Sequence, residues 1–216
     1  MAPAPTTMTS SRIAIVTGAN SGIGLAVSVA LAGAGFQVHA GMRDGASPDA
    51  LLAAAASPDA IHVVRMDVGD DDSVASAVAS VLVATDGRVD VAVANAGYGT
   101  IVSVEEASLA DHAAVMNVNY FGALRLVKAV LPAMRARGAG RIIGSSSLGG
   151  VVGFPFGSPY AASKFAMEGL WESCFGEYKD AGIHFSLVRW ILVSLLPQWF
   201  DRCPLSKAKR AGVLPS

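Results

Sequence analysis

Short apolar runs alternate with helical patterns along most of the chain, and this alternation constrains the fold more than any other feature. The apolar runs are rich in β-branched residues at consecutive positions, which is typical of strands covered by helices on both faces. We expect strands at residues 12–17, 36–41, 61–68, 89–95, 140–147 and 183–188. We expect helices at residues 22–34, 48–56, 70–85, 109–137 and 158–181.

This order of elements predicts an α/β fold, a Rossmann-like doubly wound parallel sheet with helices on both faces. The chain of 216 residues shows no linker or repeat, so we expect one domain at residues 12–188. A flexible extension at residues 1–11 would precede it, and an atypical tail at residues 189–216 would follow. Ligands of such sheets bind outside the carboxyl ends of the strands, so candidate site residues should lie just after each strand.

Composition excludes several classes of protein. Hydrophobic residues make up 52% of the chain and charged residues 15%, which argues against a disordered protein. The net charge of −1 offers no field that would recruit nucleic acid. The two cysteines, Cys174 and Cys203, are far apart and fit a reduced compartment.

Targeting and metal-binding patterns are weak. Residues 1–11 lack the charged and apolar regions of a secretory signal, and the apolar stretch at residues 190–200 is too short to cross a bilayer. We therefore expect a cytoplasmic protein without a transmembrane segment. The histidines are scattered, with His39 and His62 interpreted as structural, and neither cysteine has a partner at metal-ligand spacing, so no metal site is predicted.

The first predicted strand runs directly into a glycine-rich turn that opens the first helix. Gly18 permits a tight turn, while Gly22 and Gly24 let the backbone approach a pyrophosphate. The helix N-terminus supplies unpaired N–H groups for that anion. A bare strand–helix turn is the alternative, but the position in the first strand–helix unit favours dinucleotide binding. The turn residues expected to contact the cofactor are Gly18, Asn20, Ser21, Gly22, Ile23 and Gly24.

The end of the second predicted strand indicates which dinucleotide is preferred. An acidic residue there would hold the adenosine ribose 2′-hydroxyl of NAD. Met42 cannot do so, whereas the Arg43 guanidinium suits the 2′-phosphate of NADP. NADP is therefore favoured. Asp44 as a ribose acceptor keeps NAD open, and Arg43 as an ordinary solvated cation is a further alternative.

Tyr160 and Lys164 form the most informative pair in the chain. Their i, i+4 spacing places both on one face of the helix expected at residues 158–181. A phenol with a pKa near 10 is a poor acid or base at neutral pH, and a nearby ammonium group lowers that pKa. The pair therefore predicts acid–base chemistry.

Other polar residues follow the predicted strands. Ser147 ends the fifth strand, where its hydroxyl can hydrogen-bond a substrate carbonyl. Ser145 and Ser146 are interpreted as turn residues. Asn119 lies in an apolar helical pattern, where it either bonds locally or anchors a water near Lys164.

Together these segments resemble the short-chain dehydrogenase/reductase (SDR) family, in its single-domain branch, over residues 12–188. The residues that carry the resemblance are TGANSGIG at 17–24, Asp67-Val68, ANAG at 94–97, the Asn119 segment, the serine-rich strand end and YAASK at 160–164. The resemblance implies that Tyr160 is the general acid/base and that Lys164 makes the tyrosine more acidic and binds the nicotinamide ribose. It also implies that Ser147 polarises the carbonyl and that Asn119 supports the proton relay.

The same resemblance implies further contacts with the cofactor. Asp67 and Val68 would flank the adenine. Asn95, followed by Ala96 and Gly97, would steady the central strand beside the cofactor.

Finer similarity is to the 17β-hydroxysteroid and retinol dehydrogenase cluster, through MRD at 42–44, ANAGYG at 94–99 and the segment at 154–173. This implies an oxidoreductase acting on the secondary alcohol or ketone of a steroid-, retinoid- or lipid-like substrate. A homo-oligomer formed through the helices at 109–137 and 158–181 is a further expectation from the resemblance.

Two departures from the family pattern qualify these expectations. Ala94 stands where the family commonly has Asn, a mild change. After Val188 the family continues with a Pro-Gly turn, a substrate loop, helix and a last strand, which residues 189–216 do not resemble. We expect a truncated or frame-shifted chain that lacks the last strand; a divergent lid is the alternative. The rival functional hypothesis is accordingly an inactive SDR remnant that at most binds NADP.

Overall fold

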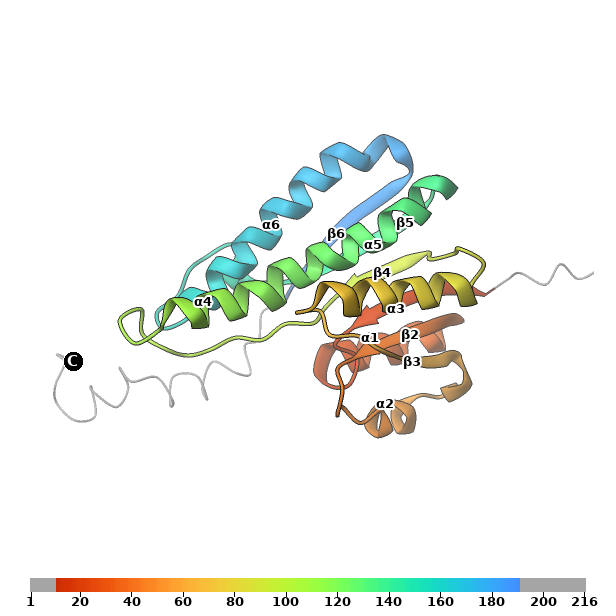
Figure 1. Cartoon of the computed structure of the whole chain (residues 1–216), viewed down its shortest axis with the longest axis horizontal. Coiled ribbons are helices and arrows are strands. Elements are labelled where there is room, and N and C mark those ends of the chain that lie inside the picture. The colour runs from red at the N-terminus through yellow and green to blue at the C-terminus, as the bar shows by residue number, and fades with distance from the viewer. Residues whose placement is uncertain (1–10, 191–216) are drawn as a thin grey trace, which may run out of the picture.

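Six parallel strands pair in the order β3-β2-β1-β4-β5-β6 in the computed structural model, which describes residues 11–190 (Figure 1). The strands are β1 (Arg12–Thr17), β2 (Phe36–Met42), β3 (Ile61–Arg65), β4 (Val91–Ala94), β5 (Gly140–Ser147) and β6 (Ile183–Trp190). The order reverses between β1 and β4, so the carboxyl ends of these two central strands flank the position where doubly wound sheets bind ligands. The predicted fold class is confirmed.

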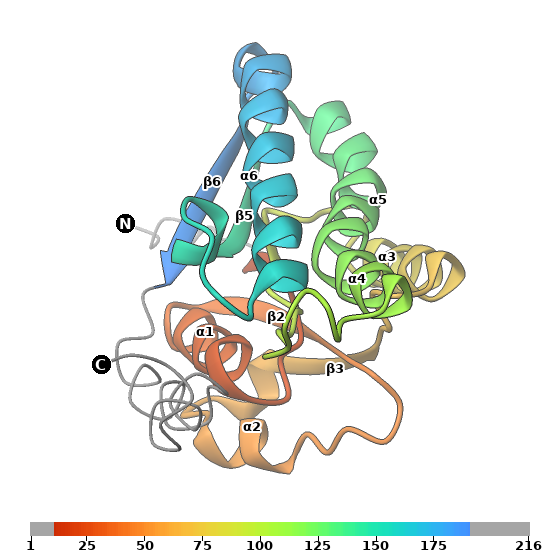
Figure 2. The same cartoon turned by 90° about the vertical axis from the view of Figure 1, so that its left-hand side faces the viewer.

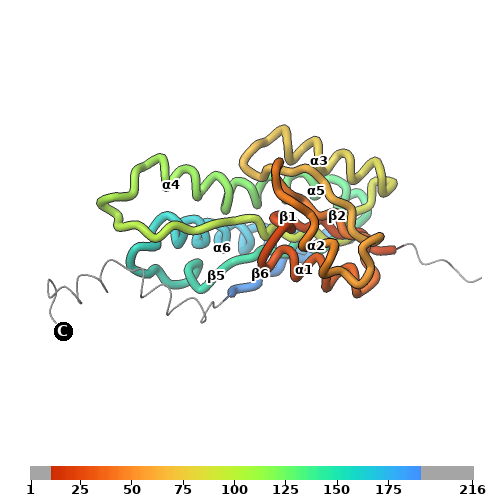
Figure 3. The backbone as a smooth tube through the Cα atoms, turned by 90° about the horizontal axis from the view of Figure 1, so that it is seen from below, coloured from red at the N-terminus to blue at the C-terminus, as the bar shows by residue number. Residues whose placement is uncertain are grey.

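Helices cover both faces of the sheet. They are α1 (Gly22–Gly33), α2 (Asp49–Ala54), α3 (Asp71–Ala84), α4 (Leu109–Met116), α5 (Gly122–Arg137) and α6 (Ser158–Tyr178). Short 3₁₀ turns lie at Pro58–Ala60, Leu148–Gly150 and Lys179–Ala181. One apolar core lies under α1 and α2, and a second lies under α3, α5 and α6. Figures 2 and 3 show α3 and α5 across the sheet from α1 and α2.

Alternation along the central strand produces these two cores. Ile13 and Ile15 face the core beneath α3 and α5, whereas Ala14 and Val16 face the core beneath α1. All four side chains are buried. A strand that is buried on both faces must be apolar at every position, as the sequence pattern indicated.

The long helix expected at residues 109–137 contains an irregular turn. A π-helical turn, Asn117–Phe121, joins α4 to α5, so the three form one continuous rod in Figure 1. Such single π-helical turns occur frequently at functional sites. Here the turn carries Asn119, whose side chain is buried. Gly138, at φ 65°, caps the rod, which ends at residue 137 as predicted.

The bounds of four strands differ from prediction: β2 ends one residue later, at Met42, and β4 covers Val91–Ala94 rather than residues 89–95. β3 ends at Arg65 rather than residue 68, because Asp67, Gly69 and Asp70 form a turn that leads into α3. β6 continues through Arg189 and Trp190, beyond the predicted end at residue 188. The expected N-terminal extension and atypical tail lie almost wholly outside the described residues. The segment in which the last strand was expected to be missing also lies outside them. Between residues 11 and 190, no helix is long and apolar enough to cross a membrane.

Candidate functional site

The glycine-rich turn between β1 and α1 is tightly folded on one side and open on the other. A Cβ at Gly24 would overlap the carbonyl oxygen of Gly18, and a Cβ at Gly18 would lie 2.9 Å from the Cα of Ala96. Gly18 and Gly22 have φ values of +66° and +54°, which favour glycine. Nothing lies within 4 Å of the Cβ position at Gly22.

The N-terminus of α1 is available to an anion. Its N-cap, Ser21, makes no side-chain hydrogen bond to the helix, and the first turn contains no acidic residue. The N–H groups of this first turn have no intrahelical partners, and they carry the positive end of the helix dipole. Asn20 and Ser21 lie between β1 and α1, and Ile23 lies in the first helical turn. This arrangement fits the pyrophosphate of a dinucleotide.

Asn95 ties the end of β4 to the end of β1. Its side-chain amide donates a 2.9 Å hydrogen bond to the carbonyl oxygen of Thr17. The backbone N–H groups of Asn95 and Ala96 each donate to the Thr17 hydroxyl at 3.0 Å. Thr17 itself was not singled out from the sequence, although it belongs to the TGANSGIG segment. These bonds hold Ala96 against the glycine-rich turn. The next residue along the chain, Gly97, is exposed.

Tyr160 and Lys164 lie in the first two turns of α6, at the carboxyl end of β5. Lys164 is only 5% exposed, and its Nζ donates a 2.6 Å hydrogen bond to the carbonyl oxygen of Ser145. The same Nζ lies 5.7 Å from the centre of the Tyr160 ring. Burial lowers the pKa of Lys164 to about 8, although the nearby Glu168 carboxylate opposes the shift. The structure therefore places an ammonium group beside a half-buried phenol.

Loop glycines make room around these two residues. A Cβ at Gly99 or Gly149 would lie 3.0 or 3.2 Å from the Tyr160 ring. A Cβ at Gly97 would lie 2.9 Å from Oδ1 of Asn119 and 3.6 Å from Nζ of Lys164. Two backbone segments, the loop after β4 and the turn after β5, thus approach the pair closely at positions without side chains.

Asn119 is held by bonds to segments far from it in the sequence. Its Nδ2 donates to the carbonyl oxygen of Tyr98 at 2.8 Å and to the hydroxyl of Ser163 at 2.9 Å. Its Oδ1 accepts from the Tyr98 N–H at 2.9 Å. Ser163 in turn donates to the carbonyl oxygen of Tyr160. Asn119 therefore connects the loop after β4 to the first turn of α6.

The three consecutive serines have separate contacts at the end of β5. Ser147 is half-buried, and its hydroxyl accepts a 3.1 Å hydrogen bond from the Gly149 N–H. The interpretation of Ser145 and Ser146 as turn residues was wrong, because both lie within β5. The hydroxyl of Ser145 accepts from the Trp190 indole N–H at 2.9 Å, and Ser146 donates to Glu168 at 2.6 Å.

Glu168 is a buried carboxylate that the sequence analysis did not identify. It lies one helical turn beyond Lys164 and receives two hydrogen bonds from Arg189 of β6, at 2.9 and 2.6 Å. Burial alone would raise its pKa, but the hydrogen bonds from Arg189 and Ser146 lower the pKa overall. Its i+4 spacing from Lys164 was the available signal.

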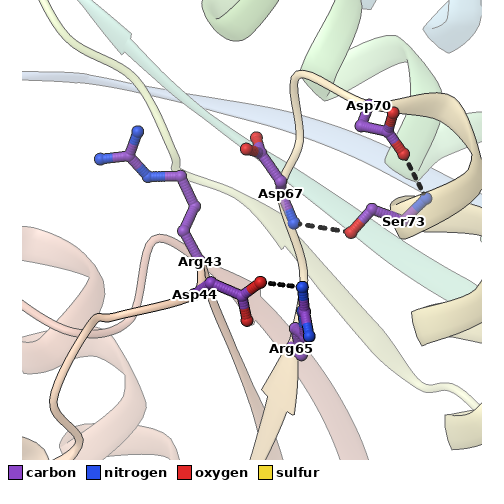
Figure 4. Close-up of a pocket in the computed structure, with 6 residues that line it drawn as sticks. All are labelled: Arg43, Asp44, Arg65, Asp67, Asp70 and Ser73. Carbon is purple, nitrogen blue, oxygen red and sulfur yellow. Dashed lines mark hydrogen bonds and ion pairs between the residues drawn. The ribbon is translucent and has the colours of Figure 1, made fainter.

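A cavity of about 450 Å³ opens where β2 and β3 end (Figure 4). It is lined by Arg43, Asp44, Arg65, Asp67, Asp70 and Ser73. Arg43 is exposed, as expected of a residue that could meet a ligand, whereas Val68 is buried beside the cavity-lining Asp67. Asp44, the alternative ribose acceptor, forms an ion pair with Arg65. Arg65 was not predicted as a site residue.

The sequence-predicted residues thus form two groups along the carboxyl edge of the sheet. One group surrounds the ends of β1, β4 and β5 and includes Tyr160, Lys164, Ser147 and Asn119. The other lies at the ends of β2 and β3, around Arg43 and Asp67. No group of three His, Cys, Asp or Glu side chains suited to a metal occurs among residues 11–190.

Comparison with known proteins identifies the family of the chain. The family model for short chain dehydrogenases matches residues 12–193, so the chain belongs to the short-chain dehydrogenase family. Human 17-beta-hydroxysteroid dehydrogenase type 1 is 41% identical over 183 residues, covering 82% of this chain and 55% of that protein. Human retinol dehydrogenase 8 is 43% identical over 182 residues, covering 82% and 57%. The chain therefore spans little more than half the length of these relatives.

Solved structures show the same fold. A short-chain dehydrogenase from Streptomyces avermitilis superposes with a TM-score of 0.80 at 32% identity, covering 92% of this chain and 77% of that one. A metagenomic short-chain oxidoreductase in complex with NADP superposes with a TM-score of 0.77 at 33% identity, covering 84% of this chain and 83% of that one. A short-chain dehydrogenase/reductase from Burkholderia phymatum in complex with NAD superposes with a TM-score of 0.76 at 31% identity, covering 83% of this chain and 65% of that one. Members of this family thus bind a nicotinamide cofactor of either kind.

Proposed function

We propose that this protein is an NADP(H)-dependent oxidoreductase that interconverts a secondary alcohol and a ketone, with residues 12–188 as its cofactor-binding domain. The observation that carries the proposal is the buried ammonium of Lys164, fixed to the end of β5 and 5.7 Å from the centre of the Tyr160 ring. An ammonium group beside a phenol favours the phenolate, which suits Tyr160 to acid–base chemistry at a carbonyl oxygen.

The residues present fit a nicotinamide dinucleotide, which when bound supplies or accepts a hydride. The N-terminus of α1 would bind the pyrophosphate, and Asp67 with Val68 would flank the adenine. Asn95 and Ala96 would position the loop that faces the cofactor. Lys164 would hold the nicotinamide ribose.

Tyr160 would exchange the proton on the substrate oxygen. In the reducing direction its phenol gives a proton to the developing alkoxide, and in the oxidising direction its phenolate takes the hydroxyl proton. Lys164, with a pKa of about 8, stays mostly protonated at neutral pH and favours the phenolate by its charge. Ser147 would donate a hydrogen bond to the substrate oxygen. Asn119 would support the proton relay by fixing the first turn of α6.

The preference for NADP and for an apolar substrate rests on separate observations. Arg43 is exposed at the cavity beyond β2, where the 2′-phosphate of NADP would lie. Relatives more than 40% identical are named for 17β-hydroxysteroids and for retinol, which supports a steroid-, retinoid- or lipid-like substrate. A homo-oligomer and a cytoplasmic location are further parts of the proposal.

Turnover of apolar ketones with NADPH, compared between the wild-type chain and Tyr160→Phe, tests this function. We expect a loss of about 100- to 10,000-fold, because the variant cannot exchange the proton. NADPH affinity, followed by the fluorescence of the reduced nicotinamide, should stay nearly unchanged. Tyr178→Phe, at the far end of the same helix, is the matched control and should keep full activity. Near-normal turnover by Tyr160→Phe would contradict the assignment, and NADPH binding without wild-type turnover would favour a cofactor-binding remnant.

A further inference from the structure

The cavity beyond β2 and β3 contains a second cation besides Arg43. Arg65 is the last residue of β3, and its partner in the β2–β3 ladder is Met42, the residue before Arg43. A 2.7 Å hydrogen bond from the Met66 N–H to the Met42 carbonyl fixes this register just beyond the pair. Both arginines consequently line the same cavity (Figure 4).

The charge of a phosphate group gives a reason for two arginines at this cavity. A phosphate monoester carries about −1.5 to −2 at pH 7, so one guanidinium leaves part of its charge unbalanced. Arginine suits the planar, bidentate recognition of phosphate. Arg43 makes no ion pair among residues 11–190 and points away from Arg65 in Figure 4. The two guanidinium groups thus border the cavity from different sides.

Two of the three carboxylates that line the cavity are bonded to backbone N–H groups. Asp67 accepts a 2.8 Å hydrogen bond from the Gly69 N–H, and Asp70 caps α3 by accepting from the Ser73 N–H at 2.7 Å. These bonds place the two carboxylates in the turn and the helix cap. Asp44 is the exception, because its carboxylate pairs with a side chain, that of Arg65.

The Asp44–Arg65 pair is exposed and therefore exchangeable. The side chains of Arg65 and Asp44 are 76% and 60% exposed. Exposed ion pairs contribute little to stability, so an incoming phosphate can displace the Asp44 carboxylate at low cost. While the pair persists, it also competes with any hydrogen bond from a ribose hydroxyl to Asp44.

We propose that Arg65 is a second ligand for the 2′-phosphate of NADP. In the absence of NADP, Asp44 holds Arg65 beside the cavity, and the 2′-phosphate then replaces Asp44 as the partner of Arg65. This inference rests on the proposed preference for NADP. Arg43, directly after β2, and Arg65, at the end of β3, would then both bind the phosphate. Asp44 would oppose this binding by attracting Arg65 and repelling the anion. Arg65 thereby acts as a specificity-determining residue.

Adenosine fragments test this without any dependence on turnover. Binding of 2′,5′-ADP and of 5′-AMP to the full chain is measured by isothermal titration calorimetry for the wild type, Arg65→Gln, Asp44→Asn and Arg43→Gln. We expect Arg65→Gln to weaken 2′,5′-ADP binding about tenfold and to leave 5′-AMP unchanged, because only the 2′-phosphate meets Arg65. Asp44→Asn should tighten 2′,5′-ADP binding several-fold. Arg135→Gln, an exposed arginine at the end of α5, is the matched control and should change neither affinity.

The outcomes separate the two proposals. If Arg43→Gln weakens 2′,5′-ADP binding and Arg65→Gln does not, the role of Arg65 is overturned while the preference for NADP stands. If the wild type binds the two fragments equally, or binds neither, the preference for NADP fails and the role of Arg65 fails with it. A salt dependence of 2′,5′-ADP binding that is shallower in Arg65→Gln than in the wild type is the expected second signature.

Discussion

The ammonium group of Lys164 donates a 2.6 Å hydrogen bond to the carbonyl oxygen of Ser145 in the interior of the protein. Glu168, one helical turn away, is the carboxylate that favours its charge, but the bonds of Glu168 go to Ser146 and Arg189. A cation buried mainly against a neutral carbonyl is costly for the folded state. The positive charge that Lys164 places beside Tyr160 therefore lowers the stability of the folded protein.

That cost should appear in the pH dependence of stability. Burial lowers the pKa of Lys164 from 10.5 to about 8, so between these pH values the unfolded chain binds the additional proton. The free energy of unfolding of the wild type should therefore rise with pH, by about 2 kcal/mol between pH 7 and 10 relative to Lys164→Met. Urea unfolding at a series of pH values measures this. Lys128→Met, at an exposed position of α5, should keep the wild-type slope. Parallel curves for the wild type and Lys164→Met would contradict the expected burial of charge.

The sequence predicted the local parts of the site better than its long-range contacts. The glycine turn and the Tyr160–Lys164 spacing are visible because each depends on neighbours within one turn or one helix. The π-helical turn at Asn119 is not visible, because bonds to Tyr98 and Ser163 accompany it and no local pattern encodes them. The long helix was accordingly expected to be regular.

Arg65 and Glu168 were missed for a related reason. A charged residue at a strand end or on a helix is usually solvated, so residue type alone gives no signal. Arg65 becomes relevant only through the β2–β3 register, and Glu168 only through its bonds to β5 and β6. The pairing of strands distant in sequence decides both cases.

Replacement of Glu168 should destabilise the junction of α6 with β5 and β6. Glu168→Gln loses the charge that Arg189 and Ser146 stabilise, so we expect a loss of about 2 kcal/mol at pH 7. Because these bonds lower the Glu168 pKa, this contribution is present above the ordinary value of 4.5 and is lost as the pH falls through the lower folded value. Urea unfolding at pH 7 and pH 3 should show the two proteins converging in acid. Glu177→Gln, exposed on the same helix, should match the wild type at both pH values, and an equal loss in that control would refute the assignment.

His39 should make the protein sensitive to mild acid. Its side chain is 7% exposed, and its ring centre lies 5.1 Å from that of His62, so burial and then the His62 charge lower its pKa from 6.5 to about 4. Between these pH values the unfolded chain binds a proton that the folded protein excludes, so stability falls as the pH falls. The wild type should lose about 3 kcal/mol relative to His39→Leu between pH 7 and 4, as measured by urea unfolding. The exposed His184 of β6 supplies the control, since His184→Leu should retain the wild-type acid sensitivity. If His39→Leu retained it as well, the acid sensitivity would have to originate at another residue.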